Sequence, residues 1–143
     1  MANTINPIPE GHHTVTPFLV LRDAGKFLDF ATKALGATLI ARHDAPGGDV
    51  MHAEIRIGDS VIMIGGARDK VTNGMLHLYV PDTDASYQRA VQAGAKSIRE
   101  PADQFYGDRS AGVEDAWGNS WWFATHKEDV SSEEMERRMA AQK

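Results

Sequence analysis

The same order of structural elements occurs twice along the chain, and this repeat constrains the fold more than any other feature. Segment 34–37 matches 92–95, and segment 54–60 matches 114–120, at spacings of 58 and 60 residues. Each copy reads as strand, helix, strand and then a pair of strands joined by a turn. Self-similarity at a near-fixed spacing requires each copy to be the same supersecondary unit. We therefore predict an α+β fold made of two βαβββ units.

Local patterns place the elements of each unit. Apolar residues at helical spacing begin with Phe27 and end at Gly36, which predicts a helix whose first turn Asp23 caps. Alternating apolar residues over 51–57, followed by the turn pair Gly58 and Asp59, predict a half-buried strand and a hairpin. In the second copy we expect strands over 75–80, 97 onward, 109–114 and 120–125, and a helix over 82–93.

We predict a single domain over 1–143 with four parts. Residues 1–13 form an N-terminal arm, 14–66 the first unit, which opens with a strand over 14–21, and 74–127 the second unit. Residues 128–143 form a charged tail in which Ser131 and Glu134 have the spacing of a capping box before a helix. His12 and His13 are expected to be solvated on the arm or packed on a neighbour.

Composition excludes several classes of function. The net charge is -5 without a basic cluster, so nucleic acid is not expected as a partner. No apolar run approaches the roughly 20 residues of a membrane span, and the N-terminus does not resemble a signal peptide, which favours a cytoplasmic protein. The chain has no cysteine, so its six histidines and its carboxylates are the strong candidate ligands for a metal.

Three stretches carry a resemblance to a known family. They read His-Thr-Val-Thr-Pro at 13–17, His-Ala-Glu-Ile-Arg-Ile-Gly-Asp-Ser at 52–60, and Asp-Gln-Phe-Tyr-Gly-Asp-Arg-Ser at 103–110. With the paired units, they resemble the vicinal oxygen chelate superfamily, and within it the PhnB-like group of glyoxalase/bleomycin-resistance proteins. The resemblance implies two curled mixed sheets, with helices on the convex sides and a concave pocket. Because this superfold serves many chemistries, it does not choose a function.

Metal-dependent members of that superfamily hold a divalent ion at four equivalent strand positions, filled by His, Glu or Gln. The resemblance assigns these positions to Thr16, Met63, Met75 and Trp122. A thioether favours soft ions and an indole offers no lone pair, so this set is unsuited to a hard or borderline metal. We therefore predict no metal and no cofactor.

A set of aromatic, thioether and titratable residues is expected to form the binding site instead. Strand parity places several of them on the concave side, whereas Tyr106 belongs to the loop before 109–114 and Arg109 to the start of that strand. The predicted ligand-binding residues are Phe18, His52, Met63, Met75, His77, Tyr79, Tyr106, Arg109 and Trp122. His77 and Glu54 are the candidates for general acid–base catalysis, and Arg109 has the chemistry to grip a carboxylate or phosphate.

Three functions remain open on the sequence. The first is metal-free binding of a small aromatic or amphipathic organic molecule. The second is a glyoxalase-type lyase or isomerase, or a dioxygenase relative, using His77 or a non-standard metal site. The third is a dimeric structural module with a closed cup. We expect a homodimer, because apolar residues of the arm and of the tail helix, Met135 and Met139, need a docking surface.

Overall fold

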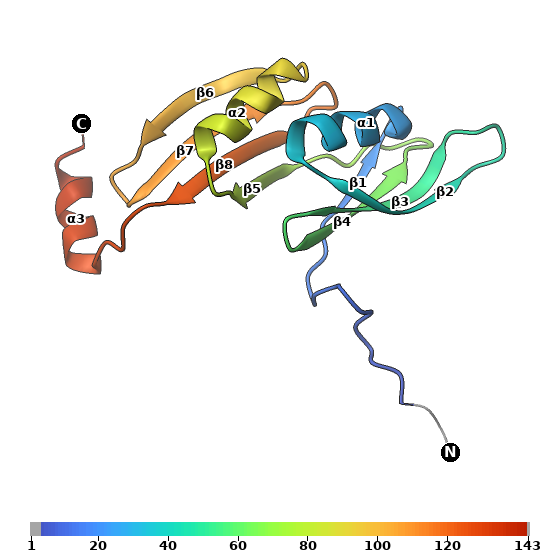
Figure 1. Ribbon diagram of the computed structural model, residues 1–143, viewed down its shortest axis with the longest axis horizontal. Helices are drawn as coiled ribbons and strands as arrows, with labels where there is room; N and C mark the ends of the chain where they lie inside the picture. Colours follow the sequence, from blue (N-terminus) through green and yellow to red (C-terminus); the bar gives the residue numbers. More distant parts are fainter. Residues whose placement is uncertain (1–3, 143) are drawn as a thin grey trace. The chain divides into compact units, whose positions relative to one another are not determined.

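A computed structural model describes residues 4–142, which fold as two compact units with their boundary between Asn73 and Gly74. The first unit contains β1 (Phe18–Leu21), α1 (Ala24–Leu35), β2 (Thr38–Asp44), β3 (Val50–Ile57) and β4 (Ser60–Gly66). Its strands form one sheet in the order β1-β4-β3-β2, in which only the β1–β4 pair is parallel (Figure 1).

The second unit repeats this arrangement. It contains β5 (Met75–Tyr79), α2 (Thr83–Gln92), β6 (Lys96–Asp103), β7 (Asp108–Glu114) and β8 (Ser120–His126), followed by α3 (Ser132–Ala140). The sheet order is β5-β8-β7-β6, again with one parallel pair, β5–β8. The prediction of an α+β fold with two βαβββ units and mixed sheets is confirmed. The predicted concave pocket and the single domain stay predictions.

Helix α1 supplies the core of the first unit, because its apolar stripe lies against the sheet. Phe27, Ala31 and Ala34 are fully buried, and the helix ends at Gly36, whose φ of 65° suits a residue without a Cβ. Asp23 takes the N-cap position of α1 as predicted, but its side chain does not cap the helix. This residue adopts the left-handed conformation, and its side chain makes no capping hydrogen bond.

The first strand is shorter than the predicted 14–21. It begins at Phe18, since Pro17 has no N–H to donate and contributes only its carbonyl, which accepts from the Met63 N–H at 2.9 Å. Thr16 therefore precedes the strand, and its hydroxyl donates to the carbonyl of His13 at 3.3 Å.

The hairpin that ends each unit differs in length between the copies. In the first unit, Ile57 pairs directly with Ser60 across a two-residue turn, whereas in the second unit Glu114 pairs with Ser120 across five residues. The predicted match of Glu54 with Glu114 is therefore wrong as a structural equivalence. In register, Glu54 lies opposite Met63 as Gly112 lies opposite Trp122.

The longer turn closes around a buried carboxylate. Asp115 accepts hydrogen bonds from the backbone N–H of Trp117 and Asn119, from the Asn119 side chain and from the Trp121 indole, at 2.8–2.9 Å. The amide oxygen of Asn119 in turn accepts from the Gly74 N–H at 3.0 Å. This network joins the start of β5 to the turn before β8.

The predicted capping box before the last helix is confirmed, since the Ser131 hydroxyl accepts from the Glu134 N–H at 3.2 Å. No helix among residues 4–142 is long and apolar enough to cross a membrane.

We expect Asp115→Ala to lower the free energy of unfolding by about 3 kcal/mol, because it leaves several buried donors unsatisfied. The measurement is urea denaturation followed by circular dichroism. The matched control is Asp59→Ala in the exposed turn of the first hairpin, where, among residues 4–142, the carboxylate accepts a hydrogen bond only from Ser60 at the start of β4. This control should change stability by less than about 0.5 kcal/mol. An equal loss in both variants would contradict the assigned role of Asp115.

Candidate functional site

Each sheet has one face covered by its helix and an opposite face, which we call the open face. In β8, Trp121 and Phe123 are buried on the side of α2, so the residue between them, Trp122, takes the open face. Along β5 the same alternation leaves Met75, His77 and Tyr79 exposed. Met75 and Tyr79 are 72% and 71% exposed, so within the described chain they do not behave as core residues.

A cross-strand row with one residue from each of the four strands crosses the open face of the second sheet. His77 pairs with Trp122, Trp122 with Gly112, and Gly112 with Arg99. The Trp122 ring lies flat against Gly112, where a Cβ would come within 2.7 Å of the ring carbons. The Arg99 guanidinium lies over the same ring, 4.9 Å from its centroid, and donates to the Ser110 hydroxyl.

The β5 end of this row is aromatic. The rings of His77 and Tyr79 are in edge-on contact, with centroids 5.1 Å apart. The row contains His77 and Trp122, and Tyr79 lies beside it in contact with His77; all three were predicted at the site. Arg99 was missed, because β6 carries register shifts on both sides of it and strand parity cannot be counted through them.

The open face of the first sheet is more polar. Phe18 pairs with Met63 and Met63 with Glu54, while the ring of His52 lies 5.8 Å from that of Phe18. These four predicted residues therefore come together. The carboxylate of Glu54 contacts His52 Nε2 at 3.7 Å.

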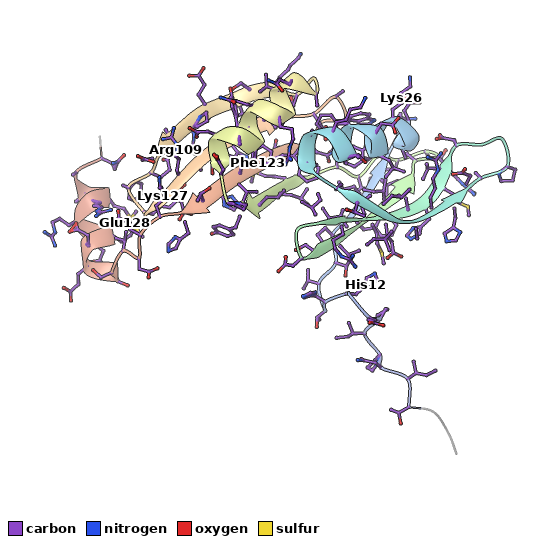
Figure 2. The ribbon with its side chains drawn as sticks, in the orientation of Figure 1. His12, Lys26, Arg109, Phe123, Lys127 and Glu128 are labelled. Atoms are coloured by element: carbon purple, nitrogen blue, oxygen red, sulfur yellow. The ribbon has the colours of Figure 1, made fainter. Side chains whose placement is uncertain are left out.

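His12 completes this cluster, contrary to the expectation that it is solvated or packed on a neighbour. Its Nε2 lies 2.8 Å from a Glu54 oxygen, and its side chain is only 14% exposed (Figure 2). No local sequence pattern predicts this contact, since 42 residues separate His12 from Glu54. Glu54, predicted to act with His77, is thus bonded to a histidine of its own unit.

Arg109, predicted at the pocket rim, instead takes the side of α2. Its guanidinium makes two hydrogen bonds to Asp84 at 2.8 and 3.0 Å and one to Asp103 at 3.3 Å (Figure 2). These hydrogen bonds raise the pKa of Arg109 above its ordinary value, and the pKa of Asp84 is lowered. Because Arg109 is neutralised and faces away from Trp122, it is corrected from a binding residue to a brace between α2 and β7.

Tyr106 lies in the loop between β6 and β7, in edge-on contact with Phe105 at 5.3 Å. The segment after β8 packs on this loop. Arg138 of α3 donates to the Phe105 carbonyl at 2.9 Å and to Glu128 at 2.7 Å. The structure thus places Tyr106 beside the tail rather than in the row of Trp122.

A sequence profile of the Glyoxalase/Bleomycin resistance protein/Dioxygenase superfamily matches residues 11–123. The chain belongs to this superfamily. Its relatives include Mb0911c of Mycobacterium bovis, which is 31% identical over 141 residues, covering 90% of this chain and 93% of that protein.

Solved structures share the fold of this chain. TioX from Micromonospora sp. ML1 has a TM-score of 0.66 at 24% identity, covering 78% of this chain and 98% of its own. The fosfomycin resistance protein FosX from Mesorhizobium loti has a TM-score of 0.60 at 15% identity, covering 79% and 91%. At these identities the likeness concerns the fold alone.

The positions that the resemblance assigns to a metal in this superfamily do not offer a fitting donor set. Met63 and Trp122 lie on open faces, Met75 is exposed at the start of β5, and Thr16 lines a cavity of about 220 Å³ next to the arm. Two thioethers, a hydroxyl and an indole do not suit zinc, nickel, manganese or iron. Within residues 4–142, no three His, Asp or Glu side chains group in a way that could hold a metal.

His126, at the end of β8, ties the tail to the second sheet. Its Nδ1 lies 2.7 Å from Asp108 on β7, and its Nε2 lies 2.7 Å from Asp129 in the tail. Hydrogen bonds to Asp129 and Asp108 raise the pKa of His126 above its ordinary 6.5. Both ring nitrogens donate only in the imidazolium form, so the protonated ring makes both contacts.

We expect the contribution of His126 to stability to depend on pH. Because folding raises its pKa, the contribution is fully present below the ordinary pKa of 6.5 and is lost as pH rises through the raised value. The effect should be small, since the side chain is 52% exposed. Melting temperatures of the wild type and His126→Gln should therefore differ most at acidic pH and converge at alkaline pH.

The control for this comparison is His43→Gln, an exposed histidine on β2. Because this position is exposed, the substitution should change the free energy of unfolding by less than about 0.5 kcal/mol. A gap for His126→Gln that stays constant or widens as pH rises would contradict the assignment.

Proposed function

We propose that this protein is a PhnB-like member of its superfamily that binds a small aromatic or amphipathic organic molecule without a metal, in the cytoplasm. The observation that carries the proposal is the row of His77, Trp122, Gly112 and Arg99 on the open face of the second sheet. Together with the neighbouring Tyr79, this row combines a flat indole, an edge-on pair of aromatic rings and a cation. Ligand sites of soluble proteins commonly combine aromatic surface with a few placed polar groups.

Two further observations support this proposal. Met75 and Tyr79 remain largely exposed beside the row, which leaves apolar surface for a ligand. FosX, a structural neighbour, is a fosfomycin resistance protein, so the same fold occurs in a drug-resistance protein. The second sheet has the aromatic character, whereas the first has a histidine–carboxylate cluster.

We expect Trp122→Ala to weaken binding of a neutral aromatic probe, 2-naphthamide, by about tenfold, the factor of an aromatic contact worth 1.4 kcal/mol. His77→Ala should weaken it by a similar factor. The measurement is a ¹⁵N NMR titration, with the Trp122 indole N–H as the reporter in the wild type and backbone amides of β5 and β8 in the variants.

Trp117→Ala, in the turn between β7 and β8, is the matched control and should leave the affinity unchanged. If His77→Ala and Trp122→Ala both lose thermal stability while affinity for the probe stays the same, the row is core. The dimeric module with a closed cup would then be the better proposal.

We further propose that the protein is a homodimer. Apolar side chains of the arm and of α3 support this, since Ile5 is 84% exposed and Met139 is 56% exposed. Native mass spectrometry of protein purified without chelators should show the mass of two chains with no metal. A monomer at micromolar concentration would refute the dimer, and one equivalent of a transition metal per chain would refute the metal-free site.

A second candidate is a glyoxalase-type lyase or isomerase. The cluster on the first sheet favours it, because His12 and Glu54 are within hydrogen-bonding distance at 2.8 Å and His52 lies beside them. A carboxylate between two imidazoles is suited to moving a proton. Metal retained in native mass spectrometry would favour this candidate over simple binding.

A further inference from the structure

Arg99 differs from Arg109 and Arg138, whose guanidinium groups are paired with carboxylates. Arg109 is bonded to the carboxylates of Asp84 and Asp103, and Arg138 to those of Glu128 and Glu134. Across residues 4–142, by contrast, no carboxylate forms an ion pair with Arg99, whose hydrogen-bond partner is the Ser110 hydroxyl. A guanidinium has five N–H donors, so most of those on Arg99 are left for another acceptor.

The side chain of Arg99 is nonetheless held in one place. The Trp122 ring lies against Gly112 of the sheet, and the guanidinium of Arg99 lies over the outer side of this ring. The guanidinium also donates a hydrogen bond to the hydroxyl of Ser110, which is buried on β7. Ordering such a side chain in advance removes part of the entropy cost of binding.

The position of this cation relative to the aromatic end of the row follows from the strand register. Arg99 originates on β6 but reaches back over Trp122, and Trp122 is the direct neighbour of His77 on β5. Adjacent strands are about 4.8 Å apart. An aromatic ring that rests on His77 and Tyr79 would therefore have its polar substituent next to the guanidinium.

We propose that Arg99 recognises the carboxylate of an aromatic acid bound to the open face of the second sheet. This inference rests on the proposed function and narrows its ligand to a planar molecule of one or two rings that carries a carboxylate. The planar fork of an arginine matches the two oxygens of that group, and hydrogen bonds between charged groups are stronger than neutral ones. Arg99 takes the role that the sequence assigned to Arg109.

The test compares 2-naphthoate with 2-naphthamide, which has nearly the same shape but no charge. By NMR titration, the wild type should bind 2-naphthoate about tenfold or more tightly than 2-naphthamide. Arg99→Gln should remove this preference while the affinity for 2-naphthamide stays within twofold. Arg99→Lys, which keeps the charge without the planar fork, should retain only part of the preference.

Arg89→Gln is the matched control, since it removes the same charge from an exposed position on α2. It should leave the preference intact, as should a salt concentration that screens distant surface charges. Ser110→Ala should weaken binding of 2-naphthoate alone, because it frees the guanidinium. 2-Naphthyl phosphate forms a third arm, and tighter binding of this probe than of 2-naphthoate would overturn the assignment to carboxylates.

The results separate the two levels of the proposal. If both naphthalene probes perturb β5 and β8 with equal affinity, or if Arg99→Gln keeps the preference, recognition of a carboxylate by Arg99 is overturned and the binding face stands. If neither probe binds at millimolar concentration, the proposed function itself fails, and the assignment of Arg99 fails with it.

Discussion

Trp121 donates its indole N–H to the buried carboxylate of Asp115, and the sidedness of β8 depends on this hydrogen bond. With Trp121 fully buried on the side of α2, the next residue must take the other face, and this residue is Trp122. A slip of one residue would exchange the two indoles and bury the proposed binding surface. The turn that closes the second unit therefore determines what its open face presents.

The repeat in the sequence predicted the order of the elements, because hydrophobic periodicity and turn residues act locally. The prediction from the repeat failed where the pairing of strands depends on the length of a turn or on register shifts within a strand. The five-residue turn made Glu114 resemble Glu54, although the register matches Glu54 with Gly112. Register shifts around Arg99 concealed its place in the row. The contact of His12 with Glu54 joins the arm to β3, and no local pattern reports such a contact.

The two sheets share a topology but have developed different open faces. In the first sheet a residue with a carboxylate, Glu54, takes the register position that Gly112 has in the second. This carboxylate contacts His12 of the arm, and both side chains are largely buried. The absence of a side chain at Gly112 instead makes room for a flat indole. The residue at one position of a duplicated strand thus accounts for a polar cluster in the first sheet and an aromatic surface in the second.

The flat indole also offers a way to compare members of the superfamily by sequence. Where a tryptophan occupies the position of Trp122, the residue opposite it on the neighbouring strand determines the orientation of the indole ring. A methyl group at Gly112 would overlap the ring in its present orientation. Glycine at that position allows the indole ring to lie parallel to the sheet, whereas any larger residue requires the ring to project from the sheet. Sorting sequences by this pair of residues would separate proteins in which the tryptophan ring lies against the sheet from proteins in which it projects away from the sheet.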